Sequence, residues 1–324
     1  MADNFIWSYL VHLGFNMWAD PAEKDGIPAF QTRLARDNHC ACDYLRFDRA
    51  VWDEVVTRLR DNGCNMILFD LGEGVQYESH PELAVKGSWS KKELADELSR
   101  LRSMGFEVIP KLNFATSHDE WLGIYSRMVS TPEYYKVCGD LIDEVIELFD
   151  HPRFFHLGMD EECRSVQEDL NLCIIRQGEL YWHDFFYFVK KAEAGGARPW
   201  VWADYIWHTK QSEESFLAHM TKDILCSNWC YSRLEETSGY QYDARCAYEL
   251  LDKHGFDQIP TASNCACPEN LELTVAHSLK TVAPERLKGF MMTTWRPTLP
   301  EKKEILLEGA DLLGQAKTKY QSAL

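Results

Sequence analysis

Short apolar runs alternate with segments of helical periodicity along most of the chain, which is the pattern of successive βα units. Eight runs have the length and composition expected of buried strands. They cover residues 8–15, 65–71, 106–114, 154–160, 199–206, 224–230, 258–264 and 289–295. Eight strands separated by helices predict an α/β protein with one (β/α)8 barrel (a TIM barrel), a single domain over residues 1–324.

Several of the intervening helices carry their own start and stop signals. Ser90 and Glu93 form a capping box at the start of one helix, and Gly105 stands where that helix should end. Thr131 followed by Pro132 predicts the start of another. Apolar stripes mark the buried faces of three helices: Leu94, Leu98 and Leu101; Val137, Leu141, Val145 and Leu148; and Val51, Val55, Val56 and Leu59 before Gly63. A final helix is predicted over residues 305–313.

An open doubly wound sheet is the main alternative architecture. Nucleotide-binding members of that class carry a glycine-rich phosphate turn after a strand, and none of the eight candidate strands here is followed by one. No linker, low-complexity segment or short repeat divides the chain. Its 324 residues suit one barrel, which normally needs roughly 250 residues or more.

The net charge limits the classes of ligand that the protein can bind, and the cysteine content indicates its cellular compartment. A formal net charge of −17 opposes binding to nucleic acid or to anionic lipid and favours a neutral or cationic ligand. The start of the chain has neither a basic region nor a cleavage site, and no apolar run is long enough to span a bilayer. Eleven cysteines form no C-x-x-C pair, as expected of small buried hydrophobes in a reducing cytosol. We therefore expect a cytoplasmic protein without metal or cofactor, while a secreted form with a removed leader is not excluded; the oligomeric state stays open.

Polar and aromatic residues gather at the predicted strand ends, where barrel enzymes carry their functional groups. In chain order they are Asp70, Glu73, Asn113, His118, Asp160, Glu161, Asp204, Trp207, Asn228, Trp229, Asn264, Trp295 and Arg296. Indole rings stack on the apolar face of a pyranose, while carboxylates bond its hydroxyls and protonate its glycosidic oxygen. A carbohydrate is therefore the expected partner.

Three carboxylates, Asp160, Glu161 and Glu162, follow the fourth predicted strand in the stretch "FFHLGMDEE". Crowded carboxylates raise one another's pKa, and a raised pKa lets a general acid keep its proton near neutrality. Alternatively, the three residues cap the next helix and favour its positive end. The spacing alone does not choose between these interpretations.

Residues 79–162 resemble the core of the glycoside hydrolase family 20 β-N-acetylhexosaminidases. The shared succession is a Pro-Glu-Leu element, a Trp-Ser helix start, a strand "EVIP" followed by a His, a helix ending "LF", and His-x-Gly-x-Asp-Glu. "VWADYIW", "ILCSNWCY" and "GFMMTTW" are similar to the family's later tryptophan-bearing strands. The chain begins at the first barrel strand, like short members that lack the additional N-terminal α/β domain.

The resemblance implies substrate-assisted retention, in which the substrate's own 2-acetamido oxygen attacks the anomeric carbon. By position, Glu161 would be the general acid and then base, and Asp160 would orient the acetamido group. Substrate binding would fall to His118, Asn113, Trp202, Asp204, Trp229, Trp295 and Asp70. A buried core histidine is the alternative for His118, and more so for His156.

Four departures from the family pattern leave the identity of the sugar open. Lys111 and Asn113 replace the two acids of the "IPEID" pattern, and Met159 replaces a glycine. The seventh strand lacks the Tyr-x-Asp that in much of the family bonds the acetamido oxygen. Pro297 stands where a sugar-binding Glu is common.

Three other functions remain open. A sugar-binding barrel without turnover would keep the aromatic residues and lose the chemistry. A retaining glycosidase with a carboxylate nucleophile would use Asp204 or Glu73, with Glu161 still the acid. A metal-dependent barrel hydrolase would draw its ligands from His12, His118, His156 and Asp204.

Overall fold

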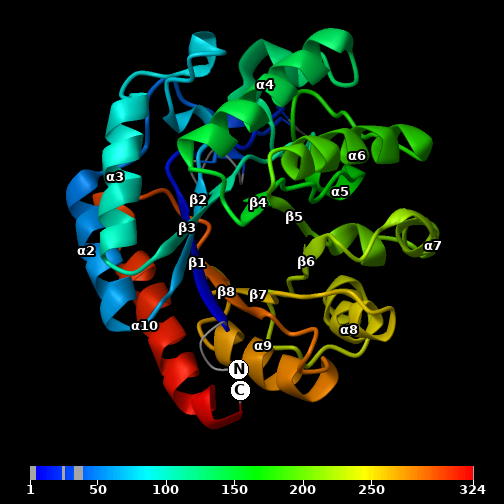
Figure 1. Ribbon diagram of the computed structural model, residues 1–324. Coiled ribbons are helices and arrows are strands. Elements are labelled where there is room, and N and C mark those ends of the chain that lie inside the picture. Colours follow the sequence, from blue (N-terminus) through cyan, green and yellow to red (C-terminus); the bar gives the residue numbers. More distant parts are fainter. Residues whose placement is uncertain (1–4, 24–25, 33–38, 324) are drawn as a thin grey trace.

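The computed structural model describes residues 5–23, 26–32 and 39–323, which form a ring of parallel strands inside a ring of helices (Figure 1). The strands are β1 Ile6–His12, β2 Met66–Asp70, β3 Glu107–Lys111, β4 Phe154–His156, β5 Arg198–Trp202, β6 Leu225–Ser227, β7 Thr261–Ser263 and β8 Gly289–Thr293. Each overlaps one of the eight predicted strands. The predicted (β/α)8 barrel is confirmed.

Strand order and two isolated bridges close the ring. The ladder runs β6-β5-β4-β3-β2-β1-β8-β7 with every pair parallel. Parallel bridges join Cys226 to Gln258 and Trp229 to Thr261, so β6 also meets the β7 side. These bridges bring the two end strands of the ladder together, so the ring is nearly closed.

The helices follow the strands around the outside of the barrel. They are α2 Arg49–Asp61, α3 Lys91–Ser103, α4 Pro132–Leu148, α5 Arg164–Gln167, α6 Glu179–Ala194, α7 Lys210–His219, α8 Tyr240–Lys253, α9 Asn270–Thr281 and α10 Lys303–Tyr320. The predicted capping box is present: Ser90 Oγ accepts from the Glu93 N–H (3.2 Å), and the Glu93 carboxylate accepts from the Ser90 N–H (2.8 Å). Thr131 caps α4 as expected, and α10 extends beyond the predicted 305–313.

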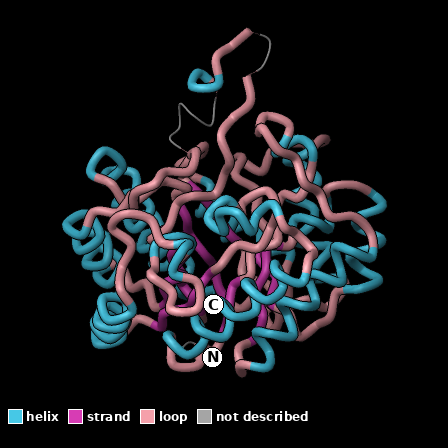
Figure 2. The backbone as a smooth tube through the Cα atoms, turned by 90° about the horizontal axis from the view of Figure 1, so that it is seen from above, coloured by secondary structure: helices cyan, strands magenta, loops and turns pink. Residues whose placement is uncertain are grey.

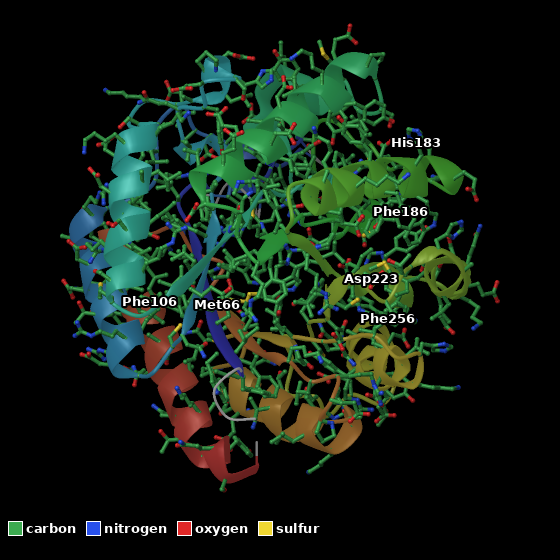
Figure 3. All side chains as sticks on the ribbon, in the orientation of Figure 1. Met66, Phe106, His183, Phe186, Asp223 and Phe256 are labelled. Carbon is green, nitrogen blue, oxygen red and sulfur yellow. The ribbon has the colours of Figure 1, made fainter. Side chains whose placement is uncertain are left out.

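The core lies between the strands and the outer helices. Figure 3 shows Met66 and Phe106 among the side chains that fill this space, and both are buried. Trp52 of α2 is fully buried, stacks on Phe69 of β2 (ring centroids 5.6 Å apart, 11° between planes) and donates its indole N–H to Glu97 (2.7 Å). A buried aromatic side chain of this kind stabilises the fold by about 1.5–3 kcal/mol.

The register places four polar residues on one level near the carboxyl ends of β1 to β4. His12 pairs with Asp70, Asp70 with Lys111, and Lys111 with His156. Residues 26–32, between β1 and α2, lie outside the barrel and include the short 3-10 helix Ala29–Gln31 (Figure 2). Within residues 5–23, 26–32 and 39–323, none of the helices has both the length and the apolar composition that a bilayer crossing requires.

Candidate active site

The turn after β4 positions the predicted acids. β4 ends at its third residue, His156, because the chain then enters left-handed backbone at Gly158 (φ 74°), Met159 (φ 73°) and Glu161 (φ 54°). A Cβ atom on Gly158 would lie 1.9 Å from the side-chain oxygen of Asn113, so only glycine fits there. The turn brings the side chains of Asp160 and Glu161 to the same side of the barrel mouth.

His118 lies between these two carboxylates. Its Nε2 is 3.1 Å from Glu161 Oε2 and 3.3 Å from Asp160 Oδ2. Asn113 donates to the other oxygen of Asp160 (2.9 Å), so both oxygens of that carboxylate have a donor. Four predicted site residues therefore form one hydrogen-bonded cluster at the ends of β3 and β4.

The cluster holds one carboxylate charged and one imidazole protonated. Burial by itself would raise the pKa of Asp160, but the charge and hydrogen bond of His118 lower that pKa to about 2. Burial would lower the pKa of His118, but Asp160 and Glu161 raise it to about 10. The expectation that crowding raises the carboxylate pKa is wrong for Asp160, because a cation lies between the two acids.

Glu162, the third carboxylate, points into the protein interior. It is buried, and it pairs with the guanidinium of Arg176, whose Nε is 3.1 Å from both carboxylate oxygens. Arg176 is buried as well; it also donates to the Phe114 carbonyl (2.7 Å) and to Asp184 (3.1 Å). Glu162 therefore ties the turn to the loop before α6. No motif in the sequence marked Arg176.

A cavity of about 440 Å³ opens beside the two acids. Its carboxylates are Asp160 and Glu161, and its aromatic walls are Trp18, Trp229, Tyr231 and Trp295. The rings of Trp229 and Tyr231 are stacked (5.0 Å, 16°), and Trp18 meets His118 edge-on (5.2 Å, 79°). Flat apolar walls beside a pair of carboxylates match the two surfaces of a pyranose.

Trp202 lies behind this cavity and does not line it. Its side chain is 2% exposed, and its ring centroid is 5.8 Å from that of Trp295 and 4.6 Å from that of His156. His156 is itself fully buried, and its Nδ1 accepts from the Gly158 N–H (3.1 Å). Trp202 therefore supports the cavity wall, and His156 is the core histidine of the alternative interpretation.

Asp70 forms an ion pair inside the barrel. Its Oδ2 accepts from Lys111 Nζ (2.6 Å) and lies 3.1 Å from His12 Nδ1; all three side chains are buried. Burial would raise the pKa of Asp70, but the positive charge of Lys111 lowers it below its ordinary value. Asp70 is absent from the described cavity lining, so the predicted contact with substrate is replaced by a structural one.

Asp204 contacts the backbone of Glu161. It is fully buried; its Oδ2 accepts from the Glu161 N–H (2.9 Å) and lies 2.8 Å from His208 Nε2. Glu73, the other nucleophile considered, is buried and accepts from the N–H groups of Phe15 (2.8 Å) and Asn16 (3.1 Å). Neither Asp204 nor Glu73 is among the described residues that line the cavity.

Tyr231 is a cavity residue that sequence reasoning missed. Its hydroxyl is buried at the cavity wall and makes no hydrogen bond of normal geometry with any described residue. Its ring lies 6.4 Å from that of Trp295. The signal was present in "NWCY", where the tyrosine stands two residues after the predicted wall residue Trp229.

The same cluster offers ligands to a cation. Among the described residues, His118, Asp160 and Glu161 form the one group whose ligand atoms lie within 4.8 Å of one another. His12 and His156, which the metal-hydrolase alternative would use, lie on the barrel strands outside this group. All eleven cysteines are free thiols.

Comparison with known proteins yields structural matches only. No family model and no curated protein matches the sequence. A chitobiase from Flavobacterium johnsoniae is 16% identical with a TM-score of 0.55, over 89% of this chain and 50% of its own. The β-N-acetylhexosaminidase of Bacteroides fragilis is 12% identical with a TM-score of 0.59, over 98% of this chain and 70% of its own. The chain has the fold of these hydrolases.

A third match is the family 20 β-N-acetylhexosaminidase of Streptomyces coelicolor, which is 12% identical with a TM-score of 0.58 over 98% of this chain and 69% of its own. The resemblance that residues 79–162 suggested is thus confirmed at the level of the fold. The chain spans 50% and 58% of the length of the first two solved structures it matches, a chitobiase and a Vibrio harveyi β-N-acetylglucosaminidase.

Proposed function

We propose that this chain is a retaining glycoside hydrolase that removes terminal 2-acetamido-2-deoxy-β-hexosides. The observation that carries the proposal is the pair Asp160 and Glu161, bridged by His118, at the wall of one aromatic cavity. The structural matches that are named chitobiase and β-N-acetylhexosaminidase support it, because they share the fold.

Glu161 is assigned the general acid and then the general base. Its side chain is 22% exposed, against 7% for that of Asp160, so Glu161 is the acid that can reach a glycosidic oxygen. His118 Nε2 lies 3.1 Å from Glu161 Oε2 and holds that side chain in position at the cavity. The buried Asp204 fixes the Glu161 backbone from below.

Asp160 is assigned to the acetamido group. With a pKa of about 2 it is anionic at neutral pH, and a fixed negative charge stabilises the positive charge that develops on the oxazolinium nitrogen. We assign to Tyr231, which follows β6 and lines the cavity, the hydrogen bond to the acetamido carbonyl, a contact that the seventh strand of this chain lacks. Trp229 and Trp295 enclose the sugar.

Substrate assistance is favoured over a carboxylate nucleophile. Retaining enzymes of the latter kind need a second carboxylate about 5–5.5 Å from the acid, across the anomeric carbon. Asp160 shares His118 with the acid on the same side, and Asp204 and Glu73 are buried against backbone N–H groups. This arrangement therefore favours the acetamido oxygen of the substrate itself as the nucleophile.

A comparison of 2-acetamido and 2-hydroxy aryl β-glycosides, with and without chelator, tests the proposal. We expect hydrolysis of the acetamido substrates only, insensitivity to chelator, a β-anomer as first product by NMR, and competitive inhibition by a thiazoline mimic of the intermediate. Comparable rates on both sugars, inversion or a trapped glycosyl ester would refute substrate assistance. Sugar binding without turnover would instead select the non-catalytic barrel.

We also propose a cytosolic location and a carbohydrate as the partner. Free thiols at all eleven cysteines fit a reducing compartment. An aromatic cavity with two acids and a chain charge of −17 fits a neutral glycan better than an anionic polymer.

A further inference from the structure

A row of four aromatic rings leads from the cavity to the protein surface. Tyr231 stacks on Trp229 (5.0 Å, 16°), and Trp229 meets Trp207 edge-on (5.2 Å, 80°). Trp207 meets Tyr240 edge-on (4.6 Å, 87°), and Tyr240 lies 6.2 Å from Trp229. Tyr231 and Trp229 line the cavity, whereas Tyr240, the first residue of α8, is 44% exposed.

Hydrogen bonds fix the inner part of this row. The Trp207 indole N–H donates to Asn228 Oδ1 (2.8 Å), and Asn228 Nδ2 donates to the Ala244 carbonyl in α8 (2.7 Å). The same helix carries Tyr240 (Figure 1). An aromatic surface held in this way loses little side-chain freedom when a ligand binds it.

The exposed end of the row lies on the side of the proposed acid. Burial raises the pKa of the Tyr240 hydroxyl, and the negative charges of Glu161 and then Asp204 raise it further, so the hydroxyl lies within the field of the acid. Trp229 borders the cavity together with Glu161. In a glycosidase the leaving group departs from the acid's side, because the acid protonates the glycosidic oxygen.

We infer that Tyr240, backed by Trp207 and Trp229, is a second sugar subsite that stacks the pyranose on the leaving-group side of the cleaved bond. The inference rests on the proposed function and narrows its substrate to a 2-acetamido sugar linked to another sugar.

The test compares a β-linked disaccharide of the preferred 2-acetamido sugar with its methyl glycoside, which has no second ring. In Tyr240→Ala the ratio of kcat/KM for the disaccharide to kcat/KM for the methyl glycoside should fall about five- to tenfold, through KM. Tyr240→Phe keeps the ring and should retain the wild-type ratio. An unchanged ratio in Tyr240→Ala, or an equal loss on both substrates, overturns the inference.

Tyr44 provides a matched control. It is an exposed tyrosine (52%) that lines a different hollow, of about 540 Å³, beside Arg46 and Pro297. Tyr44→Ala should retain the wild-type ratio, and a selective loss on the disaccharide in this variant would move the subsite to that hollow. If the wild-type chain cleaves neither substrate, the proposed function fails. The subsite is then tested by calorimetric binding. Tyr240→Ala should bind the disaccharide more weakly than the wild type does and the monosaccharide equally well, and equal binding of the disaccharide would overturn the subsite.

Discussion

Two adjacent glutamates in this chain have opposite environments. Glu161 is partly exposed at the cavity, 3.1 Å from His118, whereas Glu162 is buried against Arg176. These consecutive positions carry the proposed acid and a structural residue, because the left-handed backbone at Glu161 turns the two side chains apart.

Substitution of each glutamate by glutamine should separate these roles. Glu161→Gln should lose about 10²–10⁴-fold in kcat on a natural glycoside and less on a nitrophenyl glycoside, whose leaving group needs no proton. Glu162→Gln removes one of the two buried carboxylates that pair with Arg176 and should lower the unfolding free energy by about 3–5 kcal/mol. Kinetics on both substrates and denaturant unfolding measure the two effects. Equal losses on both substrates in Glu161→Gln would contradict the acid assignment.

The pair of His118 and Asp160 predicts a pH window for stability. The pKa of His118 is raised from 6.5 to about 10, so its contribution is complete below pH 6.5 and lost as the pH rises through 10. The pKa of Asp160 is lowered from 3.8 to about 2, so its contribution is complete above about pH 4 and lost as the pH falls through 2. The pair therefore stabilises the fold fully from about pH 4 to 6.5.

The measurement is the melting temperature of the wild-type protein and of His118→Asn from about pH 4 to pH 10. The difference between them should be largest near pH 5 to 6 and should shrink steadily towards pH 10. A difference that does not change with pH would show that His118 is neutral in the folded protein.

At the scale of elements, the short β4 strand creates the site. The strand ends after three residues, and the turn that follows uses a glycine for which no other residue has room. The turn, the end of β3 and the loop before α6 then meet through Asn113, Asp160, Glu162 and Arg176. A longer β4 would carry Asp160 and Glu161 to opposite sides of the strand.

Gly158→Ala tests this element. The added Cβ must displace Asn113, which donates to Asp160, and the φ of 74° is strained for alanine. We expect a loss of about 1–3 kcal/mol in unfolding free energy and a fall of at least tenfold in kcat.

The control is Gly105→Ala at the end of α3, where φ is 95° and nothing lies within 4 Å of the added atom. This variant should lose about 1 kcal/mol with kcat unchanged. A similar fall in kcat in both variants would mean that the loss at Gly158 is only a loss of stability.

At the scale of the whole molecule, barrel closure buries a polar layer beneath the cavity. Lys111 and Asp70 form a buried ion pair at 2.6 Å, with His12 beside them on β1 and His156 on β4. A buried pair contributes little net stability, but removing one partner leaves an uncompensated charge.

Lys111→Met should therefore lower the unfolding free energy by about 3–5 kcal/mol, because Asp70 keeps a buried negative charge. The double variant Lys111→Met, Asp70→Leu should recover a substantial part of this loss. Chemical denaturation of the single and double variants gives the coupling energy, and strictly additive losses would contradict a direct pair.

The sequence by itself determined the elements, and it marked the two acids that we propose as the reacting residues. Period-two and period-3.6 apolar patterns, the Ser90 capping box and the Thr131–Pro132 start depend on neighbours a few residues away, and all appear where expected. The His-x-Gly-x-Asp-Glu motif likewise carries its own turn, because its glycine provides the backbone that the two acids require.

Only the tertiary structure decided which partners these residues meet. His118 and Glu161 are 43 positions apart, as are Asp204 and Glu161, and Arg176 reaches Glu162 from a loop without any motif. Such contacts depend on strand register and on closure of the ring, which a local pattern does not encode. For the same reason two residues at predicted strand ends, Asp70 and Trp202, are buried and do not line the cavity, although we expected them to bind substrate. Tyr231, which we did not predict, lines its wall.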